Sequence, residues 1–96
     1  MPKPDTPKIC IVTITGADRV GIIAKLAVTM AKANVNILDV NQRVMENTFV
    51  MTMAVDVAKA TKTMAEIKRR LDKVARELRL NITLQDERLF EAMHRV

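Results

Sequence analysis

Hydrophobic residues recur along the chain with two different periods, and these periods predict alternating strands and helices. Residues 8–15 form a β-branched apolar run with both faces apolar, which is typical of a strand covered on both sides. Residues 35–45 and 49–57 alternate with a period of two, and the Glu46-Asn47 pair between them suits a tight hairpin turn. A shorter alternation over residues 81–85 predicts a fourth strand.

Two longer segments repeat their apolar residues at helical spacing. The first follows residues 16–19 and ends near residues 33–34, and we expect Asp18 to cap its N-terminus. The second begins at Thr63, whose spacing to Glu66 is that of a capping box, and residues 86–96 predict a last short helix. The positions expected to face the core are Ile22, Ile23, Leu26, Ala27 and Met30 in the first helix, Met64, Ile67, Leu71, Val74 and Leu78 in the second, and Leu89, Phe90 and Met93 in the last.

The predicted element order is therefore β-α-β-β-α-β with an extra short C-terminal helix. Two right-handed βαβ crossovers joined by a hairpin make an α+β, ferredoxin-like βαββαβ sandwich, in which a four-stranded antiparallel sheet carries two helices on one face. A chain of 96 residues suffices for one core, so we expect a flexible N-terminal lead over residues 1–7 and a single domain over residues 8–96. This fold carries many functions and does not select one.

Composition argues against several classes of function. The chain has two Phe and neither Trp nor Tyr, which disfavours the stacking of nucleic-acid bases on aromatic side chains. One Cys and one His exclude an intrachain disulfide and predict no metal site of the usual Cys/His kind. We expect no membrane span, because no apolar run reaches the required length. Residues 1–7 do not resemble a signal peptide, and the unpaired Cys10 favours a cytoplasmic location.

The charges are unevenly distributed. Lys and Arg number 16 against 11 Asp and Glu, a net charge of +5, and residues 59–79 hold a large share of the basic side chains. We interpret that segment as a solvated helix face with ion pairs at i,i+4 spacing, such as Glu66 with Arg70. The sequence offers no nucleophile with a base, no pair of carboxylates and no phosphate loop, so we expect no catalytic residues and no cofactor.

Two short motifs carry a resemblance to a known family. Residues 15–26 read TGADRVGIIAKL, and residues 33–37 read ANVNI. They resemble the pattern of the ACT domain, a small regulatory module that binds amino acids in many metabolic enzymes. That pattern is a strand, an Asp/Asn-Arg-x-Gly turn into the first helix, and an Asn-x-Asn-Ile entry to the second strand. The resemblance covers residue 8 to about residue 85, and residues 90–95 resemble the C-terminus of small stand-alone prokaryotic ACT proteins of unassigned function.

The resemblance implies a ligand site that contains Asp18, Val20, Gly21, Ile22 and Asn36. In ACT domains with known ligands, such residues meet across a subunit interface around an α-amino acid. Its carboxylate would lie at the N-terminus of the first helix, and its ammonium would face Asp18 and Asn36. We expect Gly21 to lie in the first helical turn, where its missing side chain would permit close approach of a ligand or another backbone.

Two residues depart from the family pattern. Val20 stands where many members have Pro, and Gly16 stands where some amino-acid binders have a polar side chain that contacts the ligand. The other residues of the family pattern are kept, but these two departures leave the identity of the ligand open.

We therefore expect a non-catalytic regulatory module that binds a small molecule, an amino acid above all, and acts allosterically. Two alternatives stay open: a ligand-free interaction module that regulates a partner enzyme or transcription factor, and a basic RNA-associated protein, although we expect no nucleic-acid partner. We also expect a homodimer formed over the sheet face opposite the helices, because strands 8–15 and 49–57 are rich in apolar residues. Leu89, Phe90 and Met93 are expected to add contacts.

Overall fold

The computed structural model describes residues 6–93. The predicted flexible lead over residues 1–7 and the predicted end of the last helix therefore lie largely outside the described residues, as does His94. The element order is the predicted one. The elements are β1 (Ile9–Ala17), α1 (Ile22–Lys32), β2 (Asn36–Met45), β3 (Thr48–Asp56), α2 (Met64–Leu78), β4 (Leu80–Asp86) and α3 (Glu87–Met93).

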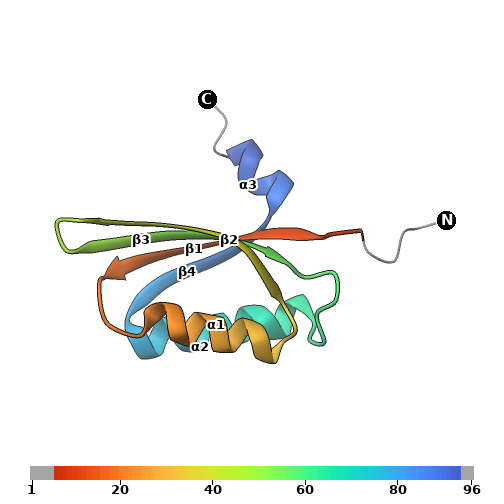
Figure 1. Ribbon diagram of the computed structural model, residues 1–96, viewed down its shortest axis with the longest axis horizontal. Helices are drawn as coiled ribbons and strands as arrows, with labels where there is room; N and C mark the ends of the chain where they lie inside the picture. The colour runs from red at the N-terminus through yellow and green to blue at the C-terminus, as the bar shows by residue number, and fades with distance from the viewer. Residues whose placement is uncertain (1–5, 94–96) are drawn as a thin grey trace.

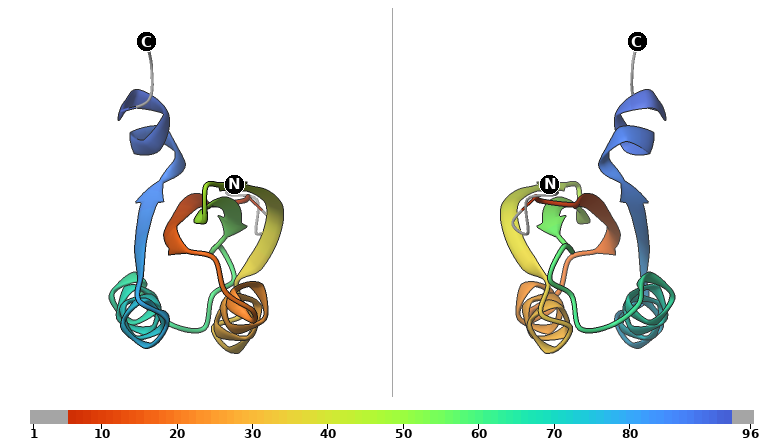
Figure 2. Two further views of the ribbon diagram at one scale, coloured as in Figure 1. Left: turned by 90° about the vertical axis from the view of Figure 1, so that its left-hand side faces the viewer. Right: turned by 90° about the vertical axis from the view of Figure 1, so that its right-hand side faces the viewer.

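The four strands form one antiparallel sheet in the order β2-β3-β1-β4, which leaves β2 and β4 at the edges. Helices α1 and α2 lie side by side on one face of this sheet, and α3 projects from the opposite side (Figures 1 and 2). The predicted α+β ferredoxin-like sandwich with an extra C-terminal helix is confirmed.

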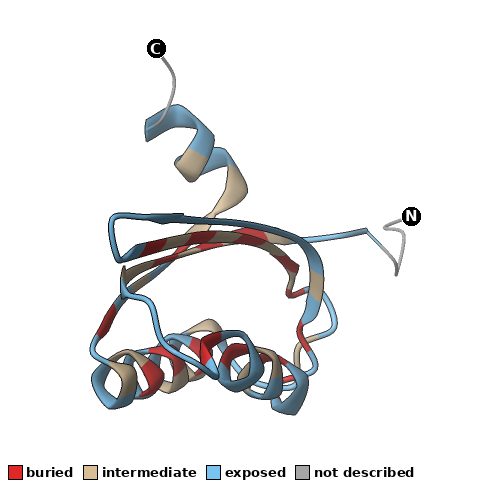
Figure 3. Cartoon of the chain, turned by 60° about the vertical axis from the view of Figure 1, so that its left-hand side comes forward, coloured by how far each residue is buried: buried red, intermediate tan, exposed pale blue. Residues whose placement is uncertain are grey.

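The core lies between the sheet and the two long helices (Figure 3). Every second residue of β3 is buried on this side of the sheet, as the alternating pattern predicted. The buried residues of α2, at helical spacing, face the same core. Ile23 is an exception to the predicted core because half of its surface is exposed, so the buried stripe of α1 is narrower than expected. The buried residues of the central strands and long helices are Cys10, Val12, Ile14, Ile22, Leu26, Met30, Phe49, Met51, Met53, Val55, Ile67, Leu71 and Val74.

Local sequence signals at a hairpin turn and at a helix start agree with the predictions. Glu46 and Asn47 have φ angles of 48° and 71°, the left-handed pair that a type I′ hairpin turn requires. The backbone N–H of Glu66 donates to Oγ1 of Thr63 at 3.1 Å, so Thr63 caps α2 as expected. Both features depend on only a few neighbouring residues, which is why the sequence indicated them.

The edge strand β2 is irregular near its start and exposed along most of its length. A register shift between Ile37 and Asp39 marks a β-bulge that leaves Leu38 outside the regular pairing with β3. Beyond the bulge, Val40 and Val44 lie opposite Met53 and Phe49, and so belong to the helix-side face. They remain 43% and 51% exposed, because the helices leave this edge of the sheet uncovered.

The sheet face opposite α1 and α2 is more polar than we predicted. The apolar residues of β3 face the helices, and the open face instead carries a row of paired threonines, Thr52, Thr13 and Thr83, across β3, β1 and β4. Helix α3 leaves β4 on this side, and its Leu89 and Met93 stay 53% and 60% exposed, whereas Phe90 is half-buried. The Met residues of β3 therefore lie on the helix side, whereas Ile11, Val50 and Ala54 share the open face with the threonines, and the predicted dimer over this face stays a prediction.

Candidate functional site

Helix α1 is entered through Gly21, which is its N-cap residue. Gly21 has φ 92° and ψ 0°, a left-handed conformation that residues with a Cβ rarely adopt. Asp18 lies three residues earlier, and α1 has no side-chain cap in the described part of the chain. The predictions that Asp18 caps α1 and that Gly21 lies in its first turn are both wrong. The physical reason is that Gly21 has left-handed, non-helical backbone angles, which only glycine adopts without strain. The helix therefore starts at Ile22, too far from Asp18 for that residue to be its N-cap.

This entry leaves the first backbone N–H groups of α1 without a side-chain acceptor, in a helix whose dipole favours negative charge at that end. The first helical hydrogen bond runs from the N–H of Lys25 to the carbonyl oxygen of Gly21 at 3.0 Å. Ile22 is buried and anchors the helix, whereas Val20 is fully exposed. A Cβ built on Gly21 would meet no atom within 4 Å, so there is open space beside this residue. Gly21 is required by its backbone conformation and not by a close contact within the chain.

The loop before α1 is tied to the β2–β3 hairpin. The N–H of Asp18 donates to the carbonyl oxygen of Asn47 at 3.3 Å, so this loop lies at the end of the sheet where β2 finishes. Gly16, just upstream, has φ 156°, and a Cβ there would lie 2.6 Å from Cδ2 of Leu80. Packing against β4 therefore accounts for glycine at the position where some amino-acid binders have a polar side chain.

Asn36 lies at the other end of α1 from the other predicted site residues. It is exposed, begins β2 and pairs with Asp56 in the register of the sheet. The 11 residues of α1 separate it from Gly21 by roughly 16 Å. Within one chain the structure thus groups Asp18, Val20, Gly21 and Ile22, and it does not bring Asn36 to them.

The surroundings of Asn36 form a shallow hollow of about 560 Å³, which Asn34, Asp56 and Lys59 also line. Oδ1 of Asp56 accepts hydrogen bonds from the N–H groups of Lys8 and Ala58 at 3.0 and 2.9 Å. These two donors, Ala58 first, hold the pKa of the Asp56 carboxyl below its usual value. One oxygen of this carboxylate therefore ties the backbone before β1 to the backbone after β3.

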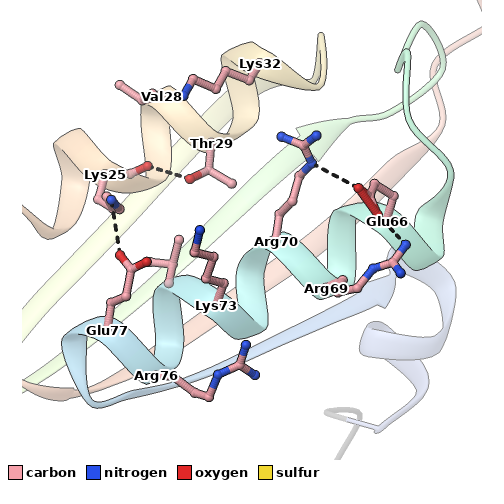
Figure 4. Close-up of a pocket in the computed structure, with 11 residues that line it drawn as sticks. Lys25, Val28, Thr29, Lys32, Glu66, Arg69, Arg70, Lys73, Arg76 and Glu77 are labelled. Atoms are coloured by element: carbon pink, nitrogen blue, oxygen red, sulfur yellow. Dashed lines mark hydrogen bonds and ion pairs between the residues drawn. The ribbon is translucent and has the colours of Figure 1, made fainter.

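The structure also shows a basic groove between α1 and α2 that the sequence analysis missed (Figure 4). Its α2 side was interpreted as a solvated face, and the predicted ion pair between Glu66 and Arg70 is present at 3.6 Å. Lys25 and Lys32 of α1, seven residues apart and hence on one face, line the opposite side. Their spacing marks a basic face of α1, but it does not show that α2 packs beside this face.

Other kinds of site have little support. Among residues 6–93 there is no group of three His, Cys, Asp or Glu side chains placed to hold a metal ion. No helix within these residues is both long enough and apolar enough to span a bilayer. Cys10 is buried in β1, and its burial, together with the nearby Asp86 carboxylate, raises the pKa of its thiol, which makes it a poor nucleophile.

These features define a small ferredoxin-like domain with an exposed glycine turn at its first helix and an uncovered edge strand. The family model that describes the ACT domain matches residues 8–85, and the chain belongs to the ACT domain family. It is 40% identical over 86 residues to a UPF0237 protein of Methanocaldococcus jannaschii, an alignment that covers 90% of this chain and 96% of the relative. The resemblance noted in the sequence is confirmed. ACT domains are typically regulatory, ligand-binding modules, and no catalytic family is indicated.

Solved structures agree on the fold. An ACT domain protein from Streptococcus pneumoniae superposes with a TM-score of 0.75 at 26% identity, covering 93% of this chain and 100% of that one. The ligand-free regulatory subunit of aspartate kinase from Thermus thermophilus gives a TM-score of 0.65 at 20% identity, covering 81% of this chain and 51% of that one. The second similarity shows a shared fold alone.

Proposed function

We propose that this chain is a non-catalytic regulatory module that binds an amino acid between two copies of itself. The observation that carries the proposal is the start of α1, where backbone N–H groups lack a side-chain cap and open space lies beside Gly21. Such a helix start favours a carboxylate. Asp18, in the same loop, offers the opposite charge at a short distance along the chain, which suits the ammonium group of a zwitterion.

The second copy is required because Asn36 lies too far from this loop in its own chain. Strand β2 is an edge strand, and its unpaired backbone groups are able to continue the sheet into another copy. An antiparallel pairing centred on Gln42 sets Val40 of one copy opposite Val44 of the other, twice, with all four helices on the same face. This arrangement covers the two half-exposed valines.

The same pairing assembles the ligand site. β2 ends beside the β2–β3 hairpin, and the hairpin is hydrogen-bonded to the Asp18 loop. In an antiparallel pair, the start of one β2 lies near the end of the other. Asn36 of each copy thereby reaches the Gly21 loop of its partner, and its side-chain oxygen can accept from the ligand ammonium. This dimer is an alternative to the one first expected over the open sheet face.

Two further observations support a regulatory role. The fold is shared with the regulatory subunit of aspartate kinase from Thermus thermophilus, an enzyme named for an amino acid. The groups around Gly21 can bind and orient a zwitterion but include no nucleophile paired with a base. We place this activity in the cytoplasm, where the unpaired Cys10 stays a thiol, and expect ligand binding to alter the contacts of a regulated partner.

The test is a thermal-shift screen of the 20 standard amino acids, followed by calorimetric titration of each hit. Because a hydrogen bond to a charged group contributes about 1.5–3 kcal/mol, Asn36→Ala should weaken binding roughly tenfold or more. Asn81→Ala is the matched control, since Asn81 is an exposed residue that lies on the opposite edge strand. It should bind like the parent chain.

A dimer with no amino-acid hit, or equal affinities for Asn36→Ala and the parent chain, would contradict the proposed ligand site. The ligand-free interaction module would then be the better description of the chain.

A further inference from the structure

The groove between α1 and α2 concentrates positive charge on the side of the molecule that faces away from the sheet. It has a volume of about 460 Å³, and its lining on α1 runs from Lys25 to the last residue of the helix, Lys32, so it includes no residue of the Gly21 loop. Arg70 and Lys73 extend from α2 toward α1 in Figure 4. The charged residues that line the groove are Lys25, Lys32, Arg69, Arg70, Lys73 and Arg76, with Glu66 and Glu77 as the acids.

Internal ion pairs neutralise only part of this charge. Nζ of Lys25 lies 3.2 Å from Glu77, which links the two helices, and Glu66 is shared by Arg69 and Arg70. Among the described residues, the remaining three cations, Lys32, Lys73 and Arg76, have no carboxylate within ion-pair distance. Six cations against two acids leave a net charge of +4 in the groove. One polar atom, Nε of Arg70, is buried there without a hydrogen-bond partner.

The groove also has apolar surface and the shape of a helix-binding site. Val28 is 51% exposed and supplies most of this surface, whereas Val74, which also lines the groove, is only 3% exposed. The lining runs from Lys25 to Lys32 on α1 and from Glu66 to Glu77 on α2, or roughly 10 and 16 Å along the two axes. A valley of this length between two packed helices accommodates about three turns of a third helix.

We propose that this groove docks an acidic, amphipathic helix of a partner protein, with apolar side chains over Val28 and Val74 and carboxylates toward Lys32, Lys73 and Arg76. Charge complementarity and the apolar floor together select this occupant. A nucleic acid fits less well, because no aromatic side chain lines the groove for stacking and the half-exposed Val28 offers an apolar contact instead. The inference is independent of amino-acid binding at the Gly21 loop.

The experiment measures fluorescence anisotropy of a labelled 14-residue synthetic peptide titrated with the full chain. The peptide carries a leucine ridge at helical spacing flanked by glutamates, and a second peptide replaces every glutamate with glutamine. We expect the glutamate peptide to bind at least tenfold more tightly, and its affinity to fall severalfold when NaCl rises from about 50 to 300 mM. A 12-nucleotide single-stranded RNA is titrated in parallel.

Charge-reversal variants locate the binding surface. Lys73→Glu should weaken binding of the glutamate peptide tenfold or more, and Lys32→Glu on the other helix should act in the same direction. Lys68→Glu, an exposed residue of the same helix that does not line the groove, changes the net charge equally and should alter affinity less than threefold. Circular dichroism checks that each variant folds.

Several results would overturn the proposal: equal binding of the two peptides, equal effects of Lys73→Glu and Lys68→Glu, or no peptide binding at millimolar concentration. RNA binding that is tighter than peptide binding and is lost in Lys73→Glu would assign the groove to nucleic acid instead.

Discussion

Pairing of two copies through β2 makes a quantitative prediction about Val40 and Val44. Replacing both with alanine removes two methyl groups from each valine, and in a single chain about half of each side chain is already exposed. At about 0.8 kcal/mol per buried methyl-sized group, each substitution should cost the interface about 0.8 kcal/mol. Four valines meet in the dimer, so the total is about 3 kcal/mol, or roughly a hundredfold in the dimer dissociation constant.

Sedimentation equilibrium over a wide concentration range measures that constant for the parent chain and for the double variant Val40→Ala/Val44→Ala. The control is Leu89→Ala/Met93→Ala, which removes the same kind of exposed apolar surface from α3. We expect the β2 variant to dissociate far more readily and the α3 variant to resemble the parent. A parent chain that stays monomeric, or an α3 variant that dissociates while the β2 variant does not, would refute pairing through β2.

Three further predictions concern stability. Gly21→Ala should lower the free energy of unfolding by about 1–2 kcal/mol, because φ is 92° there, and an unchanged urea midpoint would contradict the left-handed N-cap. Thr63→Ala should cost about 1 kcal/mol by the same assay, whereas Thr63→Ser keeps the capping oxygen and should cost much less. The lowered pKa of Asp56 means that its contribution to stability is present above its ordinary pKa of about 3.9 and is lost as the pH falls through the lower folded-state value. Acid titration of Asp56→Asn should therefore show a shallower loss of stability below about pH 4 than the parent, and parallel curves would argue against this role.

The architecture could be predicted because the features that determine it are periodic or local. The period of two through Phe49, Met51 and Met53 and the helical spacing of Ile67 and Leu71 correspond directly to burial between sheet and helices. The character of the open sheet face was less predictable. Alternation turns the Met residues of β3 toward the helices, whereas both faces of β1 carry apolar residues, so the pattern alone does not say how apolar the open face is.

The candidate site could be predicted only in part. The Asp-Arg-Val-Gly turn was recognisable, but the left-handed conformation of Gly21 displaced the helix start and left Asp18 without a capping role. The separation of Asn36 from this turn depends on how α1 packs across the sheet. The basic groove depends on the packing of α1 against α2, which no single segment encodes, so Lys25 and Lys32 could not be associated with Lys73 from the sequence.

The β-bulge at Leu38 affects how the exposed edge strand β2 associates with other polypeptides. An open edge strand is a template for uncontrolled addition of other polypeptides, and long regular edges are the usual starting points of aggregation. The bulge shortens the regular stretch of β2 to Asp39–Met45 and bends the strand. Within that stretch, a slip by one residue would turn Val40 and Val44 away from their counterparts, so incorrect registers lose the apolar contact. In the proposed pairing through β2, the irregularity would limit uncontrolled addition to this edge and leave one favoured register.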